Sequence, residues 1–240
     1  MPMLEIVVLH PADAGPATEG GADRLYVTSS VEPDLSDRGG LSVDASLVSA
    51  ICRETDLPVR PLLRLASNAT STGAEFTRLV ALGESYLAAG AEGVVFGFLD
   101  TDLLIDTDLC RSLSDALPGV PWTFRNVVDQ SLEQDRVWRD LHELRNTGLD
   151  GVHTAGSPRG LEVGSEDLIA RARRDRAAAG LMIASGGLVP EQVPWLALAG
   201  ITRFRVGASA RPGMSYKAFV DARHVRSWRK LLDEQPIRRG

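Results

Sequence analysis

One short pattern occurs four times in this 240-residue chain and limits the folds that the chain can adopt. In each copy a glycine is followed by one or two small or acidic residues and then by an apolar run. The copies read GADR before LYVTS, GAEG before VVFGF, GLDG before VHTAG and GITR before FRVGA. Each copy follows a stretch of helical character, so we expect its glycine to end a helix in the left-handed conformation. A repeated helix–glycine–strand unit predicts an α/β fold, the (β/α)8 or TIM barrel.

Eight apolar runs supply the strands of such a barrel, with amphipathic stretches between them. The predicted strands are residues 4–9, 24–28, 59–64, 94–98, 120–125, 151–154, 181–184 and 203–206. The predicted helices include 74–89, 107–116, 132–145, 165–179, 190–198 and 216–232. Polar loops at 29–40 and 65–73 follow strands, so we expect them to frame the barrel mouth, where TIM barrels build their sites. No linker divides residues 1–240, which predicts one domain.

Composition excludes several classes of function. Hydrophobic residues make up 44% and charged residues 24%, and the net charge is −6, so we expect no nucleic-acid partner. The cluster Arg171, Arg173, Arg174 and Arg176 is interpreted as a solvated helix face. No run is long enough to span a membrane, and the N-terminal residues do not resemble a secretory leader, so we expect a cytoplasmic protein. The two cysteines, Cys52 and Cys110, lie in different predicted helices and indicate no thiol-based metal site.

Polar residues at predicted strand ends are the candidate catalytic groups. Arg64 and Arg125 end apolar strands, where an unpaired guanidinium is costly. One interpretation is a clamp for a carboxylate or phosphate, and the other is a structural ion pair with a carboxylate within the mouth, for which Asp129 is a candidate. The candidate catalytic set is Asp129, Arg125, Arg64, Asn126 and Asp100.

Glycine-rich turns follow the last two strands. Many TIM barrels bind phosphate there through backbone N–H groups, although such turns also occur in barrels that have no site at this place. The candidate anion-binding residues are Arg64, Thr154, Ser185, Gly186, Gly187, Gly207, Ala208 and Ser209.

Two other polar positions favour a structural role. Glu5, in the first strand, would be a buried carboxylate if it points inward, and Arg24, Arg60 and Arg203 are its candidate partners. His10 and His153 lie near the mouth but lack a third ligand, so no metal site is expected.

The chain resembles the CutC family, the copper homeostasis proteins, from Leu4 to Ala210. The resemblance is carried by LEIVV, GGADRLYVTSS, PVRPLLR, TFRNVVD, GLDGVHTAG and RFRVGASA, and most specifically by GAEGVVFGFL. It implies a TIM barrel, a homodimer or larger homo-oligomer, a cytoplasmic location and copper as a possible ligand.

The sequence departs from the family pattern at several polar positions. Residues Val7, Leu9, Tyr26, Thr28 and Val206 stand where the family usually has cysteine, glutamate or histidine. Copper selects thiolates or imidazoles, so the resemblance with these replacements implies a divergent member without the family's copper ligands.

Three hypotheses follow. The first is an enzyme of lyase, isomerase or cyclase type that acts on a small anionic metabolite at the mouth, without a cofactor. The second is a copper-handling protein, and the third is a binding or scaffold barrel without activity. The retained arginines and aspartates at the mouth favour the first over the third.

Overall fold

The computed structural model describes residues 1–29 and 40–235 and has the predicted (β/α)8 architecture. All strand pairs in the sheet are parallel, in the order β3-β2-β1-β8-β7-β6-β5-β4. A parallel bridge between Leu62 and Val95 brings the two edges of this order together, so the sheet closes on itself. The strands are β1 (Met3–Val8), β2 (Arg24–Val27), β3 (Val59–Pro61), β4 (Val94–Phe96), β5 (Trp122–Phe124), β6 (Leu149–Thr154), β7 (Met182–Ala184) and β8 (Arg203–Val206).

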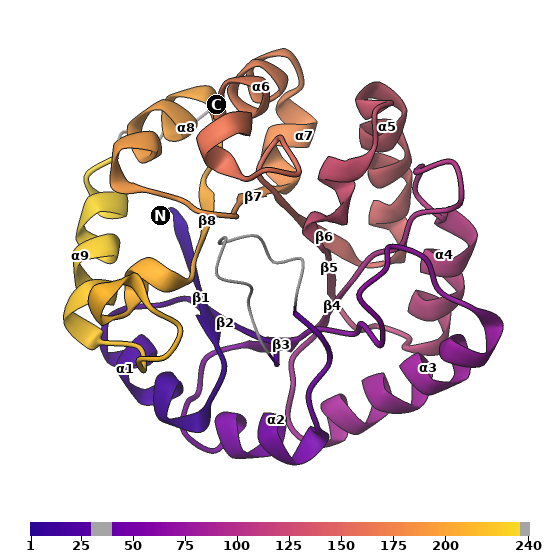
Figure 1. Cartoon of the computed structure of the whole chain (residues 1–240), viewed down its shortest axis with the longest axis horizontal. Helices are drawn as coiled ribbons and strands as arrows, with labels where there is room; N and C mark the ends of the chain where they lie inside the picture. Colours follow the sequence, from indigo (N-terminus) through magenta and orange to yellow (C-terminus); the bar gives the residue numbers. More distant parts are fainter. Residues whose placement is uncertain (30–39, 236–240) are drawn as a thin grey trace.

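Helices surround this barrel on all sides (Figure 1). They are α1 (Ala14–Glu19), α2 (Ala45–Cys52), α3 (Gly73–Ala88), α4 (Thr107–Ala116), α5 (Gln134–Leu144), α6 (Leu161–Arg174), α7 (Arg176–Leu181), α8 (Val193–Ala199) and α9 (Ala222–Asp233). Their apolar faces pack on the outward side chains of the strands in one continuous core, which is the usual arrangement in a TIM barrel. No helix in the described part of the chain is long and apolar enough to cross a membrane.

The four repeated glycines have the backbone conformation that the sequence predicts. Their φ angles are 92° at Gly21, 106° at Gly90, 96° at Gly148 and 103° at Gly200. An L side chain is disfavoured in this left-handed region. Each glycine therefore turns the chain from a helix into the next strand, and the spacing of these turns sets the barrel's repeat.

Several predicted boundaries are wrong. The strand predicted at 59–64 ends at Pro61, although the N–H groups of Leu62 and Leu63 still donate to the neighbouring strands, and Arg64 lies beyond the strand. The predicted helix 165–179 is two helices, α6 and α7, and Asp175 between them caps α7 by accepting a hydrogen bond from the N–H of Ala178. The last helix begins at Ala222 rather than at residue 216.

The predicted mouth loops are only partly described. Residues 65–73 form an irregular segment that ends at the N-terminus of α3. Most of the predicted loop 29–40 lies outside the described residues.

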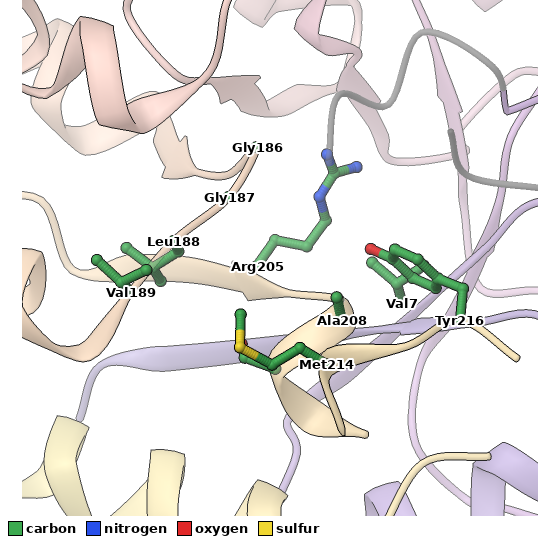
Figure 2. A pocket seen from close by; sticks show the side chains of 11 residues that line it. Val7, Gly186, Gly187, Leu188, Val189, Arg205, Ala208, Met214 and Tyr216 are labelled. Atoms are coloured by element: carbon green, nitrogen blue, oxygen red, sulfur yellow. The ribbon is translucent and has the colours of Figure 1, made fainter. Parts of the chain in front are cut away.

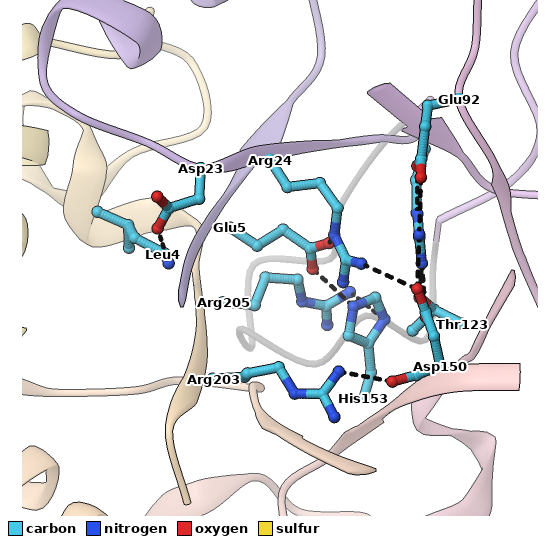
Figure 3. A network of polar contacts seen from close by, with 11 residues as sticks. Leu4, Glu5, Asp23, Arg24, Glu92, Thr123, Asp150, His153, Arg203 and Arg205 are labelled. Carbon is cyan, nitrogen blue, oxygen red and sulfur yellow. Dashed lines mark hydrogen bonds and ion pairs between the residues drawn. The ribbon is translucent and has the colours of Figure 1, made fainter. Parts of the chain in front are cut away.

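A buried ion network lies inside the barrel between residues of β1, β2, β6 and β8 (Figure 3). Glu5 accepts a hydrogen bond of 2.6 Å from Arg24 Nε, and its second oxygen lies 2.6 Å from His153 Nε2. His153 Nδ1 lies 3.1 Å from Arg205 Nη1. Since arginine can only donate, Nδ1 must be the acceptor, so the proton of His153 is on Nε2 and is donated to Glu5. Burial alone would raise the pKa of Glu5, but the charges of Arg24 and Arg205 and the hydrogen bond from His153 outweigh burial and hold it well below its usual range.

A second set of ion pairs lies beside the first. Arg60 donates to both carboxylate oxygens of Asp150 at 2.6 Å and also pairs with Glu92 at 2.9 Å. Arg203 donates to the backbone oxygen of Asp150 at 2.6 Å. Of the three arginines proposed as partners for Glu5, Arg24 is therefore the one that contacts it directly.

The Glu5 network yields a stability prediction. Glu5→Gln removes the carboxylate that Arg24 contacts at 2.6 Å and leaves its buried guanidinium only the more distant Asp150 at 4.0 Å, so we expect a loss of about 3–5 kcal/mol in the free energy of unfolding. Urea unfolding at pH 7 measures this loss. The matched control is Glu19→Gln, which removes an exposed partner of Arg226 and should cost less than about 1 kcal/mol. Equal effects of the two substitutions would contradict a structural role for the Glu5 network.

Candidate functional site

Two pockets open at the carboxyl ends of the strands. The first, called the arginine pocket, is lined by residues that include Arg64, Arg125, Asn126, Asp129 and Gly186. The second, called the turn pocket, lies between the segments that follow β7 and β8. Their volumes are about 100 Å³ and about 30 Å³, so the arginine pocket offers more room for a ligand. Gly186 lines both pockets, and they therefore adjoin each other.

Arg64 and Arg125 come from the segments after β3 and β5 and line the same pocket, as the sequence led us to expect. Both are buried, with 4% and 5% of their surfaces exposed. Arg125 donates to the carbonyl oxygens of Gly97 at 2.8 Å and Asn68 at 3.2 Å. Burial lowers the pKa of Arg125, and the positive charge of Arg64 lowers it further. The two guanidinium groups thus repel each other across the pocket.

Asp129 lines the arginine pocket but forms no ion pair with an arginine of the described chain. Its Oδ1 accepts from the Thr154 hydroxyl at 2.6 Å, and its Oδ2 accepts from the Ala155 N–H at 2.8 Å. The alternative of a structural pair between Asp129 and Arg64 or Arg125 is therefore wrong. The 3-10 turn over Asn126–Gln130 directs the Asp129 carboxylate toward the end of β6 instead.

The surroundings of Asp129 suit proton transfer. Its side chain is buried, and burial raises its pKa to about 7, although the hydrogen bonds from Thr154 and Ala155 act in the opposite direction. A carboxyl group that titrates near neutral pH can both accept and give up a proton under physiological conditions.

Thr154 does not face the mouth. His153 points into the barrel, where it meets Glu5, and successive side chains of a strand point to opposite sides. Thr154 consequently points outward and contributes its hydroxyl to Asp129 rather than to the pocket lining.

Asn126 and Asp100 have different positions. Asn126 lines the arginine pocket. Asp100 lines neither pocket, and its Oδ1 accepts the N–H groups of Asp102 and Leu104, each at 2.9 Å. Asp100 therefore stabilises its own loop.

The turn pocket contains most of the predicted anion-binding residues. Gly186, Gly187, Gly207, Ala208 and Ser209 line it, and Figure 2 shows the side chain of Arg205 between the Gly186–Gly187 turn and the side chains of Val7 and Tyr216. Ser185 lines neither pocket. Its hydroxyl is fully buried and has no hydrogen-bond partner among the described residues.

Arg205 lines the turn pocket, and our reasoning from the sequence missed it. The Arg205 guanidinium lies 4.6 Å from the centre of the Tyr26 ring, a distance typical of a cation–π contact. Arg205 stands two residues before Gly207, so alternation along β8 could have placed it inside the barrel.

The fold and the two mouth pockets define a TIM barrel of the type that carries its site at the carboxyl ends of its strands. The CutC family profile matches residues 2–210, and the chain belongs to the CutC family. A CutC family protein of Treponema denticola is 28% identical over 79% of this chain and 73% of its own length. A copper homeostasis protein cutC homolog of Drosophila melanogaster is 28% identical, and the match spans 64% of this chain and only 57% of the relative.

Solved structures agree on the fold. The crystal structure of a CutC protein from Streptococcus agalactiae superposes with a TM-score of 0.74 at 16% identity, over 86% of this chain and 98% of that one. A 3-hexulose-6-phosphate synthase superposes with a TM-score of 0.61 at 16% identity, over 96% and 99% of the two chains.

The described residues do not fit a copper site. No three His, Cys, Asp or Glu side chains within residues 1–29 and 40–235 lie close enough to share a metal ion. Cys52 and Cys110 are on the outer helices α2 and α4. Burial raises the pKa of the Cys110 thiol to about 12 and also raises that of Cys52, which opposes the thiolate form that Cu(I) prefers.

Copper titration tests this interpretation. Because the two thiols lie on different helices and resist ionisation, we expect no tight one-to-one binding of Cu(I) under reducing conditions. Competition with a chelator measures the affinity. Sub-micromolar binding that is lost in Cys52→Ser or Cys110→Ser would show that the ligand interpretation is wrong.

The raised pKa of Asp129 predicts a specific pH dependence of stability. Between its usual pKa of 3.8 and its raised pKa of about 7, the native state keeps a proton that the unfolded state has lost. Asp129 therefore stabilises the fold at low pH, and this stability is lost as the pH rises through about 7. Asp129→Asn should remove that loss. As the pH rises from 5 to 8, the free energy of unfolding should therefore fall less in the variant than in the natural protein.

Urea unfolding at pH 5 and at pH 8 measures the change in the free energy of unfolding. Asp102→Asn, at an exposed position, controls for the loss of one carboxylate. A pH dependence that Asp129→Asn leaves unchanged would contradict the buried, proton-binding state of Asp129.

Proposed function

We propose that this CutC family barrel is an enzyme of lyase or isomerase type that acts on a small anionic metabolite bound in the arginine pocket. One observation carries the proposal: two buried arginines from different strands face one pocket, and the described hydrogen bonds of Arg125 go only to carbonyl oxygens. An anion between them would offset their repulsion and form charge-assisted hydrogen bonds with both.

Asp129 supplies the acid/base group in this proposal. It lines the same pocket, and its pKa of about 7 allows both protonation states at physiological pH. A carboxylate near a bound substrate can remove a proton from one atom and return it to another, which is the step that isomerases and many lyases share. Asn126, in the same lining, would hydrogen-bond the substrate.

The turn pocket would hold the far end of a longer substrate. Gly186 joins the two pockets, and the Ser185 hydroxyl lies in the strand end just before it.

A cytoplasmic location and a homo-oligomeric state, which the family resemblance implies, stay predictions. The proposed reaction uses no cofactor.

Inorganic phosphate is the first probe of this site. We expect phosphate to stabilise the protein against thermal unfolding, since a ligand that binds only the native state raises its stability. Arg64→Ala should weaken phosphate binding by roughly 1.5–3 kcal/mol, with little loss of fold stability. Calorimetric titration measures the affinity.

Arg226→Ala is the matched control, because Arg226 is an exposed arginine on α9, and phosphate affinity should not change in that variant. If Arg64→Ala unfolds the barrel, or leaves phosphate affinity as it was, the arginines have a structural role and the proposed function loses its main support.

A further inference from the structure

A groove outside the barrel reaches the hydrogen-bond partner of Asp129. It has a volume of about 390 Å³, and residues of α5 and α6 line it together with the end of β6. Trp138 and Arg171 are among the helix residues of its lining, and Thr154 and Gly156 are those from the strand end. The groove is separate from the arginine pocket, since the two linings share no residue.

The Asp129 carboxylate and the Thr154 hydroxyl lie between these two spaces. Asp129 lines the arginine pocket and Thr154 lines the groove. The distance from Thr154 Oγ1 to Asp129 Oδ1 is 2.6 Å, and the Gly156 N–H donates to Thr154 Oγ1 at 3.1 Å. One short hydrogen bond therefore connects the interior pocket with the outer groove.

We propose that the Thr154 hydroxyl carries protons between Asp129 and water in the groove between α5 and α6. This inference rests on the proposed function, in which Asp129 is the acid/base group. Asp129 is only 8% exposed, and a substrate anion in the arginine pocket would cover its inner side further. The carboxyl group therefore needs a route other than this pocket to exchange its proton with solvent.

The proton step balances at each oxygen. Protonated Asp129 transfers its proton to Thr154 Oγ1, and the hydroxyl at the same time gives its own hydrogen to a groove water, so one proton leaves and Thr154 is unchanged. A hydroxyl has one hydrogen and two lone pairs. Thr154 Oγ1 can therefore accept from Gly156 and from Asp129 while it donates to water.

The charged groups that face the groove do not compete for the carboxyl group. Arg171 and Arg174 from α6 each pair with Asp135 of α5 at 2.6 Å. Asp167 also lines the groove. One oxygen of Asp129 accepts a hydrogen bond from Thr154 and the other from Ala155, so these bonds go to uncharged groups. The hydroxyl of Thr154 is thus a side-chain link between Asp129 and the groove lining.

Proton exchange at the Asp129 carboxyl tests the route. Nuclear magnetic resonance of the isotope-labelled carboxyl carbon, assigned with Asp129→Asn, gives both its pKa and its exchange rate at the titration midpoint. Thr154→Val removes the hydroxyl and keeps the shape, and Thr154→Ser keeps the hydroxyl. After correction of each rate for the variant's own pKa, we expect Thr154→Val to slow exchange by about tenfold or more and Thr154→Ser to stay within about twofold of the natural protein.

Exchange in Thr154→Val that matches the natural protein after this correction would overturn the route. If Thr154→Val does not fold, filling the groove by Ala170→Trp, at an exposed position of α6, should slow exchange in its place, and an unchanged rate would again overturn the proposal. A failure of phosphate to bind would contradict the proposed function. It would not affect the test of the Thr154 route, because the exchange rates are measured without phosphate.

Discussion

The hydrogen bond between Glu5 and His153 is the contact on which the barrel interior depends. It joins β1 to β6 across the barrel, at 2.6 Å and without solvent exposure of either side chain. Arg24 neutralises the carboxylate, and the bare Nδ1 of His153 accepts from Arg205. A buried charge is tolerated only when it is paired and hydrogen-bonded. This chain of contacts therefore fixes the positions of the buried Arg24 and Arg205 side chains in the barrel interior.

The mouth follows from that arrangement. Arg205 is held between His153 and the Tyr26 ring, while Arg64 and Arg125 lie further toward the carboxyl ends of their strands and line an open pocket. Arg24 and Arg60 of the floor pair with carboxylates, but Arg125 meets carbonyl oxygens. Arg64 and Arg125 thus bring positive charge to the mouth, which is where a TIM barrel binds its substrate.

Local signals predicted more of the fold than of the site. The glycines of the repeat predicted the helix ends correctly because a left-handed residue is a local requirement. The contact between Glu5 and Arg24 was among the predicted alternatives because burial demands a charge partner. The direction of Asp129 was not predictable, since it depends on a 3-10 turn that brings the carboxylate to Thr154. Thr154 was assigned to the mouth, although its position next to the inward His153 left its direction open.

The central claim is that a small anion binds between Arg64 and Arg125. Crystals grown with selenate, an oxyanion whose selenium scatters anomalously, would test the claim most directly. We expect an anomalous peak in the arginine pocket, with selenate oxygens within hydrogen-bond distance of both guanidinium groups, and no such peak in crystals of Arg64→Ala. An empty arginine pocket, with selenate bound only at surface arginines such as Arg226, would contradict the account.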